Sequence, residues 1–349
     1  MSLMEALTRP GEHAPTNPPA VAFSSVMGIC GLGLSWRAAG QVLAAPRAIG
    51  EWLIAVGVML FIALSALYGI KTVRAPSIVV AEFRDPRSAS NFACITVAVV
   101  IVAAAILPQA PSAALFLWAL GTGSQLVLFL TLLGRWIAEP TKILHATPAW
   151  LVPIVGNVTA TLPGVPLGFH ETSWFLLAVG LVSWIAFLPL LLHRLIFCED
   201  KLPERLAPSL AIFVASPAVG CLSWLQLTGR VDAVYRFILF TALFFALLVL
   251  RLWQLAVRAL PVSVAWWAYT FPSAALASAL IRYCQHVPGV GERLLAWAGL
   301  ALTTIAVTGV GLISLRNCSL RLWLSVRSRP DHSADAPGSA RTSNAVSSK

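Results

Sequence analysis

Ten apolar stretches, each long enough to cross a lipid bilayer as a helix, divide this sequence. A membrane-spanning α-helix needs about 20 mostly apolar residues, and helices and closed barrels alone satisfy their backbone hydrogen bonds inside lipid. The stretches cover residues 20–43, 50–73, 89–108, 111–136, 147–165, 172–196, 206–228, 233–257, 262–285 and 293–316. The connections between them are short, so the chain is predicted to be an all-α integral membrane protein.

The composition agrees with this prediction. Hydrophobic residues make up 58% of the chain and charged residues 11%, whereas soluble domains carry about 25% charged residues. The net charge of +10 raises the question of nucleic acid as a partner. In a membrane protein, an excess of Lys and Arg more often marks cytoplasmic loops, so we expect a lipid bilayer and no nucleic acid.

The distribution of Lys and Arg predicts the orientation. Ten spans place both termini on one side of the membrane, and eighteen of the 24 basic residues then lie on that side. The six on the opposite side are Arg37, Arg47, Arg230, Arg236, Arg282 and Arg293. By the positive-inside rule both termini are cytoplasmic, in a plasma membrane (the inner membrane of a bacterium). We divide the chain into a cytoplasmic segment 1–19, a transmembrane domain 20–317 and a disordered cytoplasmic tail 318–349.

Residues that disturb helices are concentrated in the odd-numbered spans. Proline removes a backbone donor and bends a helix, and glycine loosens it. Irregular backbone at membrane depth is tolerated where it is buried in protein or lines a wet cavity. We therefore predict five helical hairpins, with kinked odd helices inside around a pore and regular even helices outside. The predicted pore kinks are Gly28, Gly31, Pro153, Gly156, Pro163, Pro217 and Pro272.

The titratable residues argue against catalysis and, less strongly, against a pump. None of the 14 acidic residues falls in the middle of a span, and the histidines lie in loops or at helix ends. Proton- and sodium-coupled carriers usually need such a group inside the membrane. The six cysteines show neither a CxxC pair nor metal-ligand spacing. We expect no enzyme, no cofactor and no metal.

A passive anion pathway needs only a lumen, a few polar groups and a positive potential. Thr96, Asn157 and Thr159 lie in odd spans and are candidates for lining a pore; the alternative is hydrogen bonding between helices. Arg37 and Arg282 end odd spans on the outer side and are candidates for concentrating anions at a pore mouth. The alternative for these two is a side chain that extends to the membrane surface.

Phe271 stands out within "AWWAYTFPSA" (265–274) because a proline follows it directly. Pro272 has no N–H to offer the carbonyl of Ala268, so the helix is predicted to kink there. A kink turns Phe271 out of the regular helical face, and a phenyl ring across a lumen would block and dewet it. From the residues alone, packing of Phe271 against a neighbouring helix is the simpler alternative.

Five segments, in order, resemble the tellurite-resistance/dicarboxylate transporter family, which includes bacterial TehA proteins and the plant slow-type (guard-cell) anion channels. "SVAWWAYTFPSA" (263–274) is similar to the ninth helix of the plant channels. The other four are "MGICGLGLSWRAA" (27–39), "VAEFRDPRSASNF" (80–92), "TPAWLVPIVGNVTATLPGVPLG" (147–168) and "LPERLAPSLAIFVASPAVG" (202–220). The resemblance covers about residues 22–317. One departure is Cys30-Gly31, where TehA has a proline, so the first kink is expected to be softer.

The resemblance implies ten helices as five hairpins around a quasi-fivefold pore, in a homotrimer with one pore per protomer. It implies that Phe271 is the gate that plugs the pore, and that small inorganic or organic anions pass through it. Some members carry malate or sulfite. The alternative is therefore a C4-dicarboxylate or sulfite transporter, with or without proton coupling. A membrane scaffold or enzyme subunit without a pore is a third hypothesis.

Overall fold

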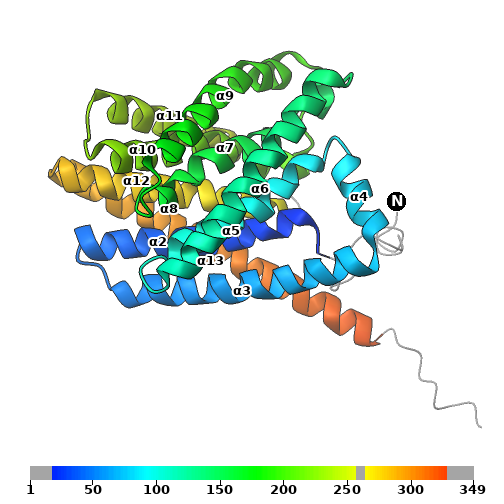
Figure 1. Ribbon diagram of the computed structural model, residues 1–349, viewed down its shortest axis with the longest axis horizontal. Helices are drawn as coiled ribbons and strands as arrows, with labels where there is room; N and C mark the ends of the chain where they lie inside the picture. Colours follow the sequence, from blue (N-terminus) through cyan, green and yellow to red (C-terminus); the bar gives the residue numbers. More distant parts are fainter. Residues whose placement is uncertain (1–17, 257–263, 328–349) are drawn as a thin grey trace, which may run out of the picture. The chain divides into compact units, whose positions relative to one another are not determined.

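The computed structural model describes residues 18–256 and 264–327, and these are helical throughout, with turns but no strand (Figure 1). The predicted all-α class is confirmed for this part of the chain. Residues 1–17 of the predicted cytoplasmic segment and the predicted tail beyond Arg327 lie outside the described residues. The described residues up to Val310 form one unit; those from Gly311 to Arg327 belong to a second and are the last part of helix α13.

The odd-numbered spans share one feature: each begins with a short 3-10 helix that leads into an α-helix. They are η1 (Ala20–Phe23) with α2 (Ser24–Val42), η2 (Ala89–Phe92) with α5 (Ala93–Ile106), η4 (Pro148–Leu151) with α7 (Val152–Thr159) and α8 (Thr161–Gly164), η5 (Glu204–Ala211) with α10 (Ile212–Thr228), and η6 (Val264–Tyr269) with α12 (Thr270–His286). Gly229 caps α10 in the left-handed region, at φ 67°, where glycine carries no side-chain penalty.

The even-numbered spans start directly as α-helices. They are α3 (Arg47–Arg74), α6 (Pro111–Ala138), α9 (His170–Phe197), α11 (Ala233–Ala256) and α13 (Val290–Arg327). Pro46 precedes α3 and Pro111 is the first residue of α6, positions at which proline leaves no helical hydrogen bond unmade. The connections hold two further helices, α4 (Pro76–Arg84) and η3 (Ile143–His145).

Eight helices in the described part of the chain are long and apolar enough to cross a membrane. The predicted fifth and ninth spans are not among them. The fifth is divided at Ala160 into helices of 8 and 4 residues, fewer than the about 20 of a regular span, and the predicted ninth, 262–285, begins outside the described residues. The count of ten spans stays a prediction.

The α-helices of the odd spans pack in a closed order. Helix α2 packs on α5, α5 on α7, α7 on α10, α10 on α12, and α12 on α2 again. Four of the five even helices lie against the odd helix before them: α3 against α2, α6 against α5, α9 against α7, and α11 against α10. Figure 1 shows α3 and α12 on opposite sides of α2. The order follows the predicted alternation of odd and even helices.

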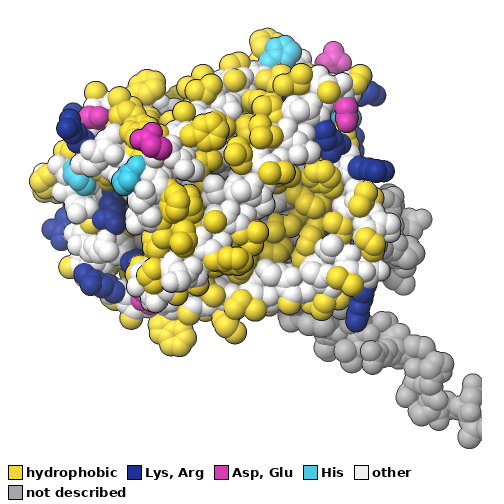
Figure 2. All heavy atoms as spheres, in the orientation of Figure 1, with side chains coloured by type: hydrophobic (Ala, Val, Ile, Leu, Met, Phe, Trp, Pro, Cys, Tyr) yellow, Lys and Arg dark blue, Asp and Glu magenta, His cyan; other side chains and the backbone are white. Residues whose placement is uncertain are grey.

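Burial separates the same two layers. In the most apolar stretch of the first, third and seventh spans, 61%, 61% and 78% of the residues are buried, against 17% to 33% in the five even spans. The even helices instead expose large apolar side chains such as Trp52, Phe116 and Phe237. Figure 2 shows apolar side chains over the middle of one face, with charged ones toward its two ends. Such a surface suits lipid.

A buried ion pair connects the start of the first inner span to helices α3 and α4. The ammonium of Lys71 in α3 lies 2.7 Å from Glu82 Oε2 in α4, and also donates to the carbonyl of Pro18. Glu82 Oε1 accepts the backbone N–H of Ala20, at 2.9 Å. Both side chains are largely buried, so each charge depends on the other.

Glu82→Leu is expected to lower the free energy of unfolding by about 3–5 kcal/mol, because it leaves the buried Lys71 ammonium without its counter-charge. Thermal denaturation of the purified protein in detergent measures the loss. Glu139→Gln is the matched control: Glu139 pairs with Arg135 at 3.7 Å and is exposed, so that change is expected to cost less than about 1 kcal/mol. Equal losses in the two variants would contradict the prediction.

Candidate functional site

A cavity of about 300 Å³ lies at the end of the inner layer where the odd helices finish. All five odd spans contribute to its wall. Representative lining residues, one from each span in chain order, are Gly31, Leu107, Leu162, Leu222 and Phe271. Its volume is at the lower limit of small-molecule sites, which hold about 300–1,000 Å³. We call it the Phe271 cavity.

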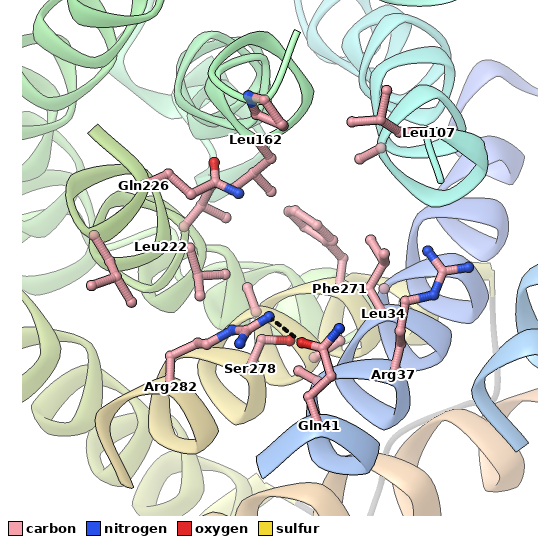
Figure 3. A pocket seen from close by; sticks show the side chains of 18 of the residues that line it. Leu34, Arg37, Gln41, Leu107, Leu162, Leu222, Gln226, Phe271, Ser278 and Arg282 are labelled. Atoms are coloured by element: carbon pink, nitrogen blue, oxygen red, sulfur yellow. Dashed lines mark hydrogen bonds between the residues drawn. The ribbon is translucent and has the colours of Figure 1, made fainter. Parts of the chain in front are cut away.

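Phe271 occupies the deep part of this cavity. It is the second residue of α12, and its side chain is 6% exposed. Figure 3 shows its ring pointing into the space between Leu34, Leu162 and Leu222. Gly31 of α2 lies beside the ring: a Cβ there would be in ordinary van der Waals contact with Phe271 Cδ2, at 3.5 Å. The phenyl ring therefore narrows the interior of the inner layer.

The backbone before Phe271 is irregular, but its form differs from the predicted kink. The chain changes from 3-10 helix η6 to α-helix α12 between Tyr269 and Thr270. Pro272 thus falls in the first turn of α12, where its missing N–H breaks no α-helical hydrogen bond. The Thr270 hydroxyl donates to the carbonyl of Trp267, and the Ser273 hydroxyl to that of Tyr269.

The other three prolines that were predicted as kinks lie in two different settings. Pro153 lies in the first turn of α7, after η4, as Pro272 does in α12. Pro217 is inside the continuous helix α10, and Pro163 inside the short helix α8. A bend of the helix axis at any of these prolines stays a prediction.

Gly28 and Gly156, two residues that were predicted as kinks, lie where two helices pack closely. Helix α2 is one uninterrupted α-helix through Gly28 and Gly31. A Cβ on Gly28 would lie 2.5 Å from Thr270 Cβ, and a Cβ on Gly156 would lie 2.5 Å from Gln125 Cδ. Glycine at these two positions lets neighbouring helices approach closely, which the sequence analysis did not foresee.

The two predicted pore-mouth arginines both line the Phe271 cavity, and their surroundings differ. Arg37 makes a two-pronged pair with Glu51 of α3, with Nε and Nη2 each 2.7 Å from a carboxylate oxygen. Its Nη1 donates to the carbonyl of Ala105, at 2.8 Å. The pair holds the guanidinium in place and compensates its charge.

Arg282 keeps its positive charge uncompensated. Its Nη2 donates to Gln41 Oε1 at 2.8 Å (the dashed line in Figure 3) and its Nη1 to Gln285 Oε1 at 3.0 Å. Both acceptors are neutral amides, and among the described residues no carboxylate lies within ion-pair distance of Arg282. No Asp or Glu of the described residues lines the cavity. Its mouth therefore carries positive potential, which attracts anions.

The three predicted pore-lining polar residues lie outside the wall of this cavity. The Thr96 hydroxyl donates to Gln125 Oε1, and Gln125 Nε2 donates to the carbonyl of Pro153 at 2.6 Å. Asn157 Nδ2 donates to the same carbonyl at 3.1 Å, and the Thr159 hydroxyl to that of Val155 at 2.8 Å. These bonds match the alternative of contacts within and between helices, and a pore-lining role stays a prediction.

The sequence analysis missed several polar residues of the wall. Gln41, Gln226 and Ser278 line the cavity, and Ser278 Oγ is 2.9 Å from Ser35 Oγ. The sequence did contain a signal for them: the lining residues of α12 stand at positions i, i+3, i+4, i+7 and i+11, which share one face of a helix. They are Phe271, Ala274, Ala275, Ser278 and Arg282.

Comparison with known proteins identifies a family that matches most of the chain. The family "SLAC1: Voltage-dependent anion channel" matches residues 17–317. The S-type anion channel SLAH2 of Arabidopsis thaliana is 31% identical over 307 residues, 84% of this chain and 58% of that protein. SLAH3 of the same plant is 26% identical, over 83% of this chain and 46% of its own length. The tellurite resistance protein TehA homolog of Haemophilus influenzae is 27% identical, over 76% and 81%. This chain thus spans about half the length of these plant relatives.

Proposed function

Because the chain belongs to the SLAC1 family of voltage-dependent anion channels, we propose that it is an anion channel of the plasma membrane whose pore is plugged by Phe271. The observation that carries the proposal is the Phe271 cavity. Residues of five different spans enclose it, and a single phenyl ring occupies its deep part. Rotation or removal of one side chain would then open a path.

The charge of the cavity supports anions as the permeant species. Arg282 presents an uncompensated guanidinium at the mouth, and the deeper wall is apolar with few polar groups. An apolar wall offers little to replace the water around an ion, so anions with a low cost of dehydration are expected to pass best. The lack of a mid-span carboxylate in the sequence favours passive flow.

We extend the proposal to the architecture. Ten spans form five hairpins around a quasi-fivefold pore, with the inner helices η4–α7–α8 and η6–α12 completing the count, and both termini are cytoplasmic. The closed packing order of the inner helices supports this. A homotrimer with one pore in each protomer rests on the family resemblance alone.

A carrier is the second candidate. Gln41, Gln226, Ser278 and Arg282 lie around one cavity, and a guanidinium with neutral donors suits a carboxylate. The Phe271 cavity would then be the binding site of a C4-dicarboxylate such as malate, or of sulfite.

Flux in liposomes separates the hypotheses. With the purified protein reconstituted and the membrane potential set, chloride and nitrate flux is expected to rise in proportion to anion concentration and to need no pH gradient. Flux that saturates with malate and follows a proton gradient would instead establish the carrier. No flux of any of these anions, from wild type or from Phe271→Ala that is folded by its melting curve, would overturn both and favour a scaffold without a pore.

A further inference from the structure

A second pocket, of about 280 Å³, lies where three of the odd spans begin. Its wall comes from η2, from the segment of η3 and η4, from η5 with the turn before it, and from the last turns of α9. It is lined by Arg87, Asn91, Leu144, Thr147, Ala149, Arg194, Asp200, Lys201, Leu202, Pro203, Leu206 and Ser209. It shares no lining residue with the Phe271 cavity. We call it the Arg194 pocket.

Arg194 is unusual because it is charged, buried and unpaired. It is 3% exposed, and its Nε and Nη1 are buried without a hydrogen-bond partner in the described part of the chain. No carboxylate of the described residues lies within ion-pair distance of it. Asp200 lines the same pocket but does not pair with it. A buried guanidinium in this state is costly unless something else accepts its hydrogen bonds.

The other charges of the pocket have the same sign. Arg87 and Lys201 are exposed residues on its wall, and Asp200 is the one acidic residue among the described residues that line it. The lining therefore carries three positive charges and one negative charge. An anion bound at Arg194 would be attracted by all three.

The backbone around the pocket adds positive potential. The 3-10 helices η2, η4 and η5 continue into α5, α7 and α10, so three inner helices begin near it. The first turns of a helix leave N–H groups without helical acceptors, and the aligned peptide dipoles make that end positive. Residues of all three 3-10 helices line the same pocket as Arg194, and helix starts near a pocket favour anions.

We propose that the Arg194 pocket is a binding site for a small oxyanion, whose oxygens accept the hydrogen bonds of the Arg194 guanidinium. Two unpaired donor nitrogens call for more than one acceptor atom, which an oxyanion supplies and a halide does not. Arg87 and Lys201 steer the anion in from the aqueous phase. Because the starts of three inner helices contribute to the wall, the occupant is a free anion and not the phosphate of a lipid. Binding here does not require that any anion pass Phe271.

Thermal denaturation of the full chain in an uncharged detergent, titrated with sodium sulfate against sodium chloride of equal ionic strength, tests the site. A ligand that binds the folded protein raises its melting temperature, so sulfate is expected to raise that of the wild type in a saturable manner. Arg194→Gln is expected to weaken the apparent affinity by roughly tenfold or more, the effect of losing a hydrogen bond to a charged group. Arg236→Gln, an exposed arginine of α11 outside both cavities, should leave it unchanged.

The same affinity for sulfate in wild type and Arg194→Gln would overturn the proposal. So would a loss of the effect in Arg282→Gln alone, which would place the anion in the Phe271 cavity. Stabilisation by phosphatidylglycerol in place of sulfate would identify a lipid phosphate and overturn the free anion. If Arg194→Gln does not fold, the exposed Arg87→Gln and Lys201→Gln decide: each is expected to weaken sulfate binding severalfold, and unchanged affinity in both contradicts the site.

Discussion

Phe271→Ala is expected to raise chloride and nitrate flux through the reconstituted protein by at least about tenfold, which corresponds to a barrier lower by about 1.4 kcal/mol. The physical reason is steric. The ring fills the deep part of a cavity enclosed by five spans, and Gly31 on the facing helix has no side chain to take its place. Alanine would leave a wider passage that water can enter.

The measurement is anion flux in liposomes at a set membrane potential, with wild type and variant at equal protein density. Phe271→Leu, which keeps an apolar side chain of similar reach, is expected to give an intermediate flux. Phe129→Ala is the matched control, since Phe129 of α6 is equally buried but does not line the cavity. If Phe271→Ala and Phe129→Ala lower the melting temperature alike and neither changes flux, Phe271 is a packing residue.

Gly28→Ala is expected to give the largest loss of stability among single-methyl additions in the inner layer. A Cβ at this position would lie 2.5 Å from Thr270 Cβ. That atom is bonded directly to the backbone of α12, so it moves only if α2 and α12 separate. Both residues are buried. Overpacking of this kind costs about 1–3 kcal/mol and sometimes more.

Thermal denaturation in detergent measures the loss, and the chain offers a close control. Gly123 of α6 has no atom within 4 Å of where a Cβ would lie, so Gly123→Ala is expected to be neutral or to stabilise by up to about 1 kcal/mol, the helix-propensity gain. The double variant Gly28→Ala with Thr270→Gly should recover part of the loss. Equal stability of Gly28→Ala and Gly123→Ala would mean that α2 and α12 do not approach closely there. Because Thr270 adjoins Phe271, flux should be measured in the same variants.

The positions of the helices followed closely from the sequence. The first predicted span, 20–43, is Ala20–Val42 in the structure, and the sixth, 172–196, is within His170–Phe197. The reason is that bilayer thickness sets the length of an apolar segment, and polar or proline residues such as Pro46 and Pro111 mark its limits. The concentration of glycine and proline in odd spans likewise indicated which helices are buried.

The form of the irregular backbone could not be predicted. Pro153 and Pro272 were predicted as kinks; each lies just after a 3-10 helix and not in the middle of a continuous α-helix. A proline excludes one hydrogen bond; which helical form precedes it depends on the side chains that pack around that turn. Gly28 was predicted as a kink of α2; the structure shows a further role, since glycine there lets α12 come close.

The sequence by itself determined the class of protein and the limits of most helices, because apolar length is a property of the chain; by family resemblance it also singled out Phe271 as a candidate. Only the tertiary structure decided which charged side chains lack a counter-charge. Arg37 and Arg282 are alike in sequence, yet the fold brings Glu51 to Arg37 and only neutral amides to Arg282. Arg194 looks like an ordinary charge at a helix end, but packing buries it beside the starts of three inner helices. A charge is compensated or not according to which helix faces meet, and that is settled in three dimensions.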